Sequence, residues 1–537
     1  MNAFPKWLSC SLALVLCLQL AGCGGGATST STSINTSNGS VTPTNPGQAV
    51  SHAVCPATSL QNSIANNGNG SSATVYMDLC PITDNGTPSV SANIPYVSIY
   101  LCAPGSTTAC GWIDHVEVDT GSEGLRLLAE AIPAQVLSAM PSVTAANFVQ
   151  NGSSQTAFAG TAPIGECYAF VSSFFWGGVR SADVTVGGMV APPGNPGSTG
   201  LKISNLSLQV LNDPSLPATP PATTPGVNCG VSGGLASAQS SNANTIRANG
   251  IIGVGLFSDD CHTAGNSGST STNKCSQNGA PATYYACQNG TCTAAGPVIN
   301  PVTNAVSTPF PITGVTVANP VSAAGKGNLS LAMSTAPTLI NVTQPDGTVG
   351  GVAGTLTFGP INAPTTTLVA DPTNGFIQST VNGKNYAVSQ VGGVVTGSYI
   401  DSGSNTLYFS NGGTTATGLP DQNISAVSTC PGTAANPGPA YPFACVTGGS
   451  VTLPTTMGSW QFGAGTLNFT ISPAPTVSDA LTLFNASNGP AYAGLAIVSS
   501  AYFSPGVFAW GLPFFFQRTV YFGIYSPSVT GTPYYGF

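Results

Sequence analysis

Charged residues are scarce in this chain. Its 537 residues include 9 Lys and Arg, 17 Asp and Glu, and 3 His, and charged residues make up 5% of the sequence. Proteins that bind nucleic acid or anionic membrane surfaces need clusters of basic side chains. With so few cations and a net charge of −8, the sequence argues against both as partners.

Histidine and long charged helical faces are also lacking. Only His52, His115 and His262 are available for a histidine-based triad or a zinc site, so neither is favoured and no metal or cofactor is predicted. The 66 Gly and 43 Pro, together with abundant Ser, Thr, Val and Asn, indicate many turns. We therefore expect an all-β chain with room for two or more domains.

The first 22 residues have the pattern of an export signal. The apolar run at 8–20 is too short to span a membrane stably. It leads into Leu20-Ala21-Gly22-Cys23, which resembles the end of a bacterial lipoprotein signal and predicts a lipid on Cys23. The resemblance implies a cell-envelope location, with the outer membrane favoured because Gly24 follows the cysteine. Residues 23–72, rich in Ser, Thr and Gly, are predicted to form a tether.

The cysteine content predicts disulfides. Lipidation of Cys23 and removal of Cys10 and Cys17 leave twelve of the 15 cysteines, an even number in an exported chain. A metal site at Cys287 and Cys292 is a weaker alternative, because no His lies nearby. The candidate pairs are Cys102–Cys110 and Cys430–Cys445, with Cys261, Cys275, Cys287 and Cys292 pairing among themselves and Cys55, Cys80, Cys167 and Cys229 in longer links.

One short motif occurs twice. Val118-Asp119-Thr120-Gly121-Ser122 is matched by Ile400-Asp401-Ser402-Gly403-Ser404. Each copy is an apolar residue, Asp, a small hydroxyl residue, Gly and a second hydroxyl residue. A single copy could arise by chance in a chain this rich in Ser, Thr and Gly. Two copies, each preceded by an apolar strand, indicate a pair of carboxylates able to share one proton and activate a water molecule.

A second pattern repeats in the same order. Asn249-Gly250-Ile251-Ile252-Gly253 follows the first motif, and Phe508-Ala509-Trp510-Gly511 follows the second. Each is an apolar strand with a glycine that permits close approach to a neighbouring backbone. The order predicts two related lobes, at 73–340 and 341–537.

Alternating apolar runs between turn clusters predict the remaining elements. Residues 129–140 predict a helix. Residues 167–175 and 179–186 predict a hairpin with Gly177-Gly178 near its turn. Residues 187–230 and 257–300 are expected to be surface insertions. Further strands are predicted at 73–79, 96–101, 114–118, 354–358, 386–388, 398–400 and 406–409.

These motifs resemble the pepsin-type aspartic peptidases. The two Asp motifs are similar to that family's active-site loops, and Gly250 to Gly253 is similar to the strand that follows in the first lobe. Residues 354–362 resemble the opening of the second lobe, and 510–518 its final strand and turn. The resemblance implies an all-β, bilobal fold. The chain also resembles a group of bacterial exported lipoproteins that share these motifs and have no established activity.

The resemblance implies a role for each residue of the two motifs. Asp119 and Asp401 would share a proton, one acting as base toward water and the other polarising the scissile carbonyl. Ser402 stands where the family usually has Thr, and it keeps the hydroxyl. The supporting residues are Thr120 and Ser402, which would lock the loops together by hydrogen bonds, Ser122 and Ser404, which would hydrogen-bond the carboxylates, and Gly121 and Gly403, which would let backbone approach them.

The resemblance also implies a flap, a hairpin that closes over the substrate. Residues 168–186 stand at the right place in the order, and Tyr168 and Trp176 are the candidates for its aromatic residue. Core packing of both is the alternative.

Other polar and aromatic residues near the motifs are assigned no chemistry. His115 is expected to be structural or at the surface. Asp114, Glu123 and Arg126 are expected to make surface hydrogen bonds or salt bridges. Asp259-Asp260 would be a poor calcium site. Phe514 to Phe516 are expected in the core.

The expected function is an aspartic endopeptidase, monomeric and anchored by lipid, cleaving a peptide or protein in the cleft between the lobes. One alternative keeps the fold without the chemistry, as a surface lipoprotein that grips peptide or polysaccharide. Another is a β-rich adhesin in which the motifs are turns. Retention of both Asp residues and all four hydroxyls favours the enzyme.

Overall fold

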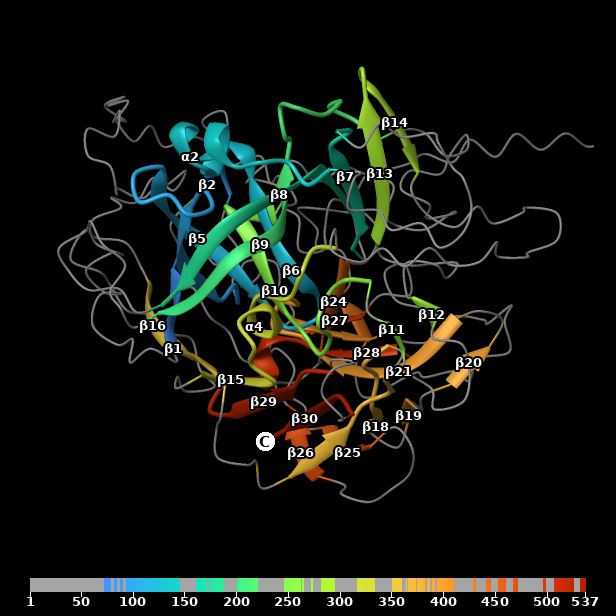
Figure 1. The fold of residues 1–537 in the computed structure, drawn as a ribbon. Coiled ribbons are helices and arrows are strands. Elements are labelled where there is room, and N and C mark those ends of the chain that lie inside the picture. The colour runs from blue at the N-terminus through green and yellow to red at the C-terminus, as the bar shows by residue number, and fades with distance from the viewer. Residues whose placement is uncertain are drawn as a thin grey trace, which may run out of the picture.

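The computed structural model of this protein consists almost entirely of β-strands (Figure 1). It describes residues 72–78, 93–144, 161–187, 200–220, 246–261, 282–294, 316–333, 350–359, 364–381, 394–409, 507–525 and 532–537, with small gaps in some of these ranges, and short strands elsewhere. The α-helices among these residues are α2 (Ala134–Ala139) and α4 (Pro320–Ala323). The expectation of an all-β chain is confirmed.

Six strands from the first half of the chain close into a ring. Around the ring they run β8, β9, β6, β10, β5 and β4, and β4 pairs back onto β8 from Ile99↔Val186 to Cys102↔Asp183. No sequence pattern predicts this closure, because pairing partners are not encoded locally. The members are β4 (Tyr96–Cys102), β5 (Cys110–Asp119), β6 (Glu123–Leu128), β8 (Phe174–Val186), β9 (Leu201–Leu211) and β10 (Gly250–Val254).

The ring belongs to a 15-stranded sheet that joins the two halves of the chain. From β4 the sheet continues through β1 into strands of the second half, and from β8 it continues into a hairpin at its other end (Figure 1). The joining strands are β1 (Ser72–Asp78), β16 (Gly350–Phe358), β15 (Asn328–Met333), β29 (Thr519–Gly523), β30 (Tyr534–Gly536) and β17 (Thr367–Val369), and the other end holds β7 (Ile164–Ala169), β13 (Ala282–Gln288) and β14 (Thr291–Ala294).

The second half contributes two further sheets, drawn largely in orange and red in Figure 1. The seven-stranded sheet runs β20 (Ser389–Val391), β21 (Val394–Ile400), β28 (Val507–Trp510), β22 (Leu407–Phe409), β27 (Ala496–Val498), β24 (Tyr441–Cys445) and β23 (Ser428–Cys430). The four-stranded sheet runs β19 (Lys384–Tyr386), β18 (Gln378–Val381), β25 (Leu453–Gly458) and β26 (Leu467–Ile471). Two-stranded ribbons join β2 (Ile82–Asp84) to β3 (Thr87–Ser89) and β11 (Thr263–Ala264) to β12 (Thr272–Asn273).

The predicted hairpin exists, but its turn is misplaced in the prediction. β7 and β8 pair from Gly165↔Gly178 to Ala169↔Phe174, and Phe170 N–H donates to Ser173 O at 2.8 Å across the turn. Gly177-Gly178 lies inside β8 instead. A Cβ on Gly177 would collide with the backbone of Val210 on β9. The glycine pair therefore serves close strand packing, a use that sequence alone does not distinguish from a turn.

Both predicted surface insertions contain strands. Residues 187–230 include β9, which lies between β8 and β6, and 257–300 include the β13–β14 hairpin, which pairs with β7. The alternation in β9 shifts by one residue, with Leu201 and Ile203 buried before the shift and Leu206 and Leu208 after it. Asn205, at φ 53°, lies at the shift, where β9 has one residue more than β8 between the paired positions. This break hides the strand from a period-two pattern.

The predicted helix at 129–140 is only partly helical. A 3-10 turn, η1 (Ala129–Ala131), is followed by α2, and Pro133 sits between them as the N-cap of α2. Proline has no N–H to continue a helix, so it divides the segment. No helix in the described residues is long and apolar enough to cross a membrane.

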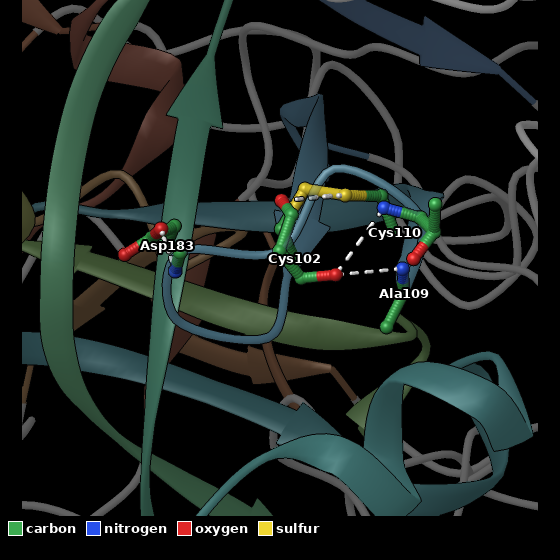
Figure 2. Close-up of a disulfide and its surroundings, with 7 residues drawn as sticks. Cys102, Ala109, Cys110 and Asp183 are labelled. Atoms are coloured by element: carbon green, nitrogen blue, oxygen red, sulfur yellow. Dashed lines mark hydrogen bonds between the residues drawn. A yellow bond between two sulfur atoms is a disulfide. The ribbon is translucent and has the colours of Figure 1, made fainter.

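Disulfides are confirmed at two predicted places. Cys102 on β4 bonds Cys110 on β5, next to Asp183 of β8 (Figure 2). Cys287 on β13 bonds Cys292 on β14, so the metal alternative for these two cysteines is wrong. Cys167 and Cys261 are also disulfide-bonded. The side chains of Cys430 and Cys445, and all of Cys23, Cys55, Cys80, Cys229 and Cys275, lie outside the described residues.

The aromatic segment near the C-terminus packs in the core, as predicted. Phe514, Phe515 and Phe516 are each at most 3% exposed. The 3-10 turn η4 (Leu512–Phe514) carries the chain from β28 toward β29. Trp510 lies 4.3 Å from Phe508 and 5.7 Å from Phe514, measured between ring centroids. This packing fixes the end of β28, which lies beside the second Asp motif.

Candidate active site

The two Asp motifs occupy matching places in the strands. β5 ends at Asp119 and runs parallel to β10, with Gly253 opposite Asp119. β21 ends one residue before Asp401 and runs parallel to β28, with Ile400 opposite Trp510. In each half, the strand after the Asp loop pairs antiparallel with that same later strand, β6 with β10 and β22 with β28. Each apolar Gly-containing strand therefore lies beside its Asp motif.

The two loops interlock through reciprocal hydrogen bonds. Thr120 N–H donates to Ser402 Oγ at 3.2 Å, and Ser402 N–H donates to Thr120 Oγ1 at 2.9 Å. Each hydroxyl then donates to the opposite strand, Thr120 Oγ1 to Ile400 O at 3.4 Å and Ser402 Oγ to Val118 O at 2.5 Å. Four bonds between segments about 280 residues apart hold the loops in a fixed relation.

Each Asp carboxylate accepts the same pair of hydrogen bonds from its own loop. One comes from the backbone N–H two residues later, and the other comes from the serine hydroxyl three residues later. Such donors favour the ionised form and fix its orientation. The bonds are Gly121 N–H to Asp119 Oδ1 at 2.7 Å, Ser122 Oγ to Asp119 Oδ2, Gly403 N–H to Asp401 Oδ1 at 2.9 Å, and Ser404 Oγ to Asp401 Oδ2 at 2.6 Å.

The two carboxyl groups lie against each other. Asp119 and Asp401 are 5% and 9% exposed, and each lies against the glycine of the other loop. A Cβ on Gly121 would lie 2.5 Å from Asp401 Cγ, and one on Gly403 would lie 2.6 Å from Asp119 Oδ1. Burial, the charge of Asp119 and its hydrogen bond raise the pKa of Asp401 well above its usual range, against the opposing effect of Ser404 and Gly403. The pair therefore retains a proton where isolated carboxyls would be ionised.

A family model matches residues 71–537, and its description is "Protein of unknown function (DUF3443)". The chain belongs to the DUF3443 family. The matched region begins just before β1 and contains both Asp loops and every strand of the structure. No curated protein matches the chain.

In this DUF3443 protein the interlock offers a direct test of how the loops hold the pair. Ser402→Ala removes the acceptor of Thr120 N–H and the donor to Val118 O, both of which are buried. We expect about 1–3 kcal/mol loss in the free energy of unfolding, measured by urea denaturation. Ser138→Ala, which removes an exposed hydroxyl, is the control and should change stability little. Equal stability of the two variants would show that the interlock does not hold the loops.

Both flap candidates of this DUF3443 chain pack in the core. Tyr168 on β7 lies under Arg126, whose Cζ is 3.7 Å from the ring centroid. Trp176 on β8 donates from Nε1 to Pro217 O at 2.7 Å, and its ring packs edge-on against Tyr285 at 5.5 Å. Both side chains are at most 5% exposed. These contacts correspond to the core-packing alternative.

The polar residues near the first motif are buried, so their expected surface placement is wrong. Asp114, His115, Glu123 and Arg126 are all at most 5% exposed. His115 packs against the rings of Tyr76 and Tyr96, at 5.7 and 4.9 Å, and its structural role stands. The burial of these charged residues cannot be predicted from their position beside an apolar strand, because the residues that cover them come from distant segments of the chain.

Arg126 forms the centre of a buried ion cluster. Its Nη2 lies 2.9 Å from Glu166 Oε1 on β7 and 3.0 Å from Asp260 Oδ2 after β10. Tyr284 on β13 donates its hydroxyl to Asp260 at 2.8 Å. Because Asp260 is bound to Arg126 and Tyr284, it is not available to bind calcium. The described residues contain no cluster of potential metal ligands. The cluster ties the strand after Asp119 to its neighbours.

A third carboxyl, which no motif marks, lies beside the Asp pair. Glu117 precedes Asp119 by two residues on β5 and is 8% exposed. Burial and the charges of Asp119 and Asp401 raise its pKa well above the usual range. Its position two residues before the motif, on the same face of a strand, is the signal that could have found it.

Proposed function

We propose that this protein is an aspartic endopeptidase. The observation that carries the proposal is the buried pair of Asp119 and Asp401, each lying against the glycine of the other loop and presented by two interlocked loops of matching structure. A pair of buried carboxyls sharing a proton is the apparatus that an aspartic peptidase needs. A protein that only binds a ligand does not need such a pair.

A pepsin-like bilobal fold is part of the proposal. The matching strand arrangements around the two loops, β5–β10–β6 and β21–β28–β22, support two related lobes. A sheet shared by both halves supports a fixed relation between them. The substrate would be a peptide or protein lying across the carboxyl pair, at the junction of the lobes.

The chemistry follows from the ionisation of the pair. With one proton between them, the ionised carboxyl takes a proton from a bound water, which attacks the peptide carbonyl carbon. The protonated carboxyl, favoured at Asp401 by its raised pKa, donates a hydrogen bond to the carbonyl oxygen. Ser122 and Ser404 keep the carboxyls oriented through the step. Collapse of the tetrahedral intermediate, with proton transfer to the leaving nitrogen, completes hydrolysis.

The proposed setting is the cell envelope, with the monomeric protein anchored through a lipid on Cys23. Residues 23–72, as a tether, would let the folded part reach substrates away from the membrane. Metabolic labelling with a fatty-acid analogue, compared between the native chain and Cys23→Ser, distinguishes a lipid anchor from a simple cleaved signal.

Cleavage of a diverse peptide library tests the enzymatic proposal. The library is incubated with disulfide-bonded protein from acidic to neutral pH, with and without a statine-type inhibitor. Cutting that the inhibitor blocks is the expected result. Absence of cutting at every pH would overturn the proposal and favour a protein that binds ligands at this site without hydrolysing them.

A further inference from the structure

Glu117 faces the same side of its strand as Asp119. Side chains two residues apart on a β-strand lie on one face. Across the neighbouring strands, Glu117 is opposite Tyr96 on β4 and Ile251 on β10. Burial and the charges of Asp119 and Asp401 raise the pKa of the Glu117 carboxyl, in agreement with its place on the same face of β5 as Asp119. Three carboxyls therefore share one buried region.

No basic side chain among the described residues is paired with this third carboxyl. No hydrogen bond from the described residues reaches the Glu117 carboxyl, and the groups acting on its pKa are the two Asp residues and burial. The nearest guanidinium in sequence, that of Arg126, is bound to Glu166 and Asp260. Ionising a carboxyl that is more than nine-tenths buried costs free energy, and this cost raises its pKa. An external cation would remove that cost.

The duplicated position in the other half carries a different side chain. Tyr399 precedes Asp401 by two residues, as Glu117 precedes Asp119. The Tyr399 ring stacks on Phe376 at 5.4 Å with the planes 14° apart. The charges of Asp401 and Asp119 act on Tyr399 as well. An acidic residue thus precedes one Asp of the pair, and a tyrosine stacked on a second aromatic ring stands at the equivalent position before the other.

We propose that Glu117 is a specificity-determining residue, which binds a lysine or arginine side chain of the substrate on one side of the carboxyl pair, while Tyr399 contacts an apolar side chain on the other. The inference rests on the proposed function for the cleavage step, but recognition of the basic side chain is a binding property that can be measured without cleavage. A desolvated ammonium–carboxylate pair is strong and selective.

Binding of paired statine-containing peptides tests the assignment. The two peptides carry lysine or its uncharged analogue norleucine at a position flanking the statine, and each flank is tried in turn by calorimetry. On one flank the wild type is expected to prefer lysine by about 10-fold or more, since a charge-assisted hydrogen bond has that effect on affinity. Glu117→Gln should reduce the preference to about 2-fold or less. Glu130→Gln, at an exposed glutamate of η1, is the matched control and should keep it.

Several results would overturn the assignment: equal binding of both peptides by the wild type, no binding of either, or a lysine preference that survives in Glu117→Gln. The outcome is separable from that of the proposed function. Inhibitor-sensitive cutting without a lysine preference would refute only the role of Glu117. A lysine preference that Glu117→Gln abolishes, in a protein that cuts no peptide, would refute only the peptidase.

Discussion

Asp401→Asn is expected to reduce peptide cleavage by about a thousandfold or more. The amide cannot carry the shared proton, and it cannot replace a carboxyl that alternates between acid and base in each cycle. Side-chain volume and the hydrogen bonds from Gly403 N–H and Ser404 Oγ to the amide oxygen can be kept. The turnover rate on the best peptide of the library is the measurement, and Asp119→Asn should behave alike because the pair acts as a unit.

A matched control separates chemistry from folding. Asp183→Asn changes a carboxylate that accepts backbone N–H groups of Gly105 and Asn205 at 2.7 and 2.9 Å, away from the pair. That variant should keep its activity. Cleavage by Asp401→Asn within tenfold of the wild type would rule out the mechanism.

Stability should respond to Asp401→Asn in the opposite direction from activity. The pKa of Asp401 is raised in the folded protein by burial and by Asp119, so the folded chain binds this proton more tightly than the unfolded chain. The contribution of Asp401 to stability is therefore greatest below its unfolded pKa of about 4 and is lost as pH rises toward the folded value. Asp401→Asn should be at least as stable as the wild type at pH 7. If Asp401→Asn unfolded at pH 7, its loss of cleavage would be explained by unfolding and would give no support to a catalytic role of Asp401.

The strands and hydroxyl residues around the Asp loops can be predicted from the sequence, but the charged residues that surround the loops in space cannot. The repeated motif, the apolar strands after it and the hydroxyls on the loops are local patterns, and the structure brings them together. Glu117 and Arg126 lie within the strands that flank the first loop, and nothing local shows what faces them. Their surroundings come from Asp401, Glu166 and Asp260, which are 40 to 284 residues away.

Strand pairing limits the prediction of the fold in the same way. A period-two pattern identifies β4 and β5, but it misses β9, where the pattern shifts at Asn205. The Gly177-Gly178 pair is typical of a turn, but Gly177 lies within a strand and packs against the backbone of β9. Each error comes from a residue whose conformation is set by a partner strand rather than by its neighbours in sequence.

Arg126→Met is expected to lower the free energy of unfolding by about 3–5 kcal/mol. Methionine keeps much of the side-chain volume but leaves Glu166 and Asp260 buried without their cation. It also removes the donor to the Glu123 carbonyl oxygen, at 2.5 Å, and the guanidinium over Tyr168. Urea denaturation at pH 7 with disulfides intact gives the measurement. Lys202→Met, which removes an exposed cation from β9, is the control and should change stability by less than about 0.5 kcal/mol.

The pH dependence of this loss identifies its cause. Burial and the charge of Glu166 already raise the pKa of Asp260, while Arg126 lowers it, so removing the guanidinium raises it further. A carboxyl with a raised folded pKa stabilises the fold when protonated and ceases to do so as pH rises through that value. The deficit of Arg126→Met should therefore shrink as the pH falls from 7 toward 4. A deficit independent of pH would assign the loss to packing around Tyr168 instead, and a deficit below about 1 kcal/mol would show that the buried cluster contributes little to holding the strand after Asp119 in place.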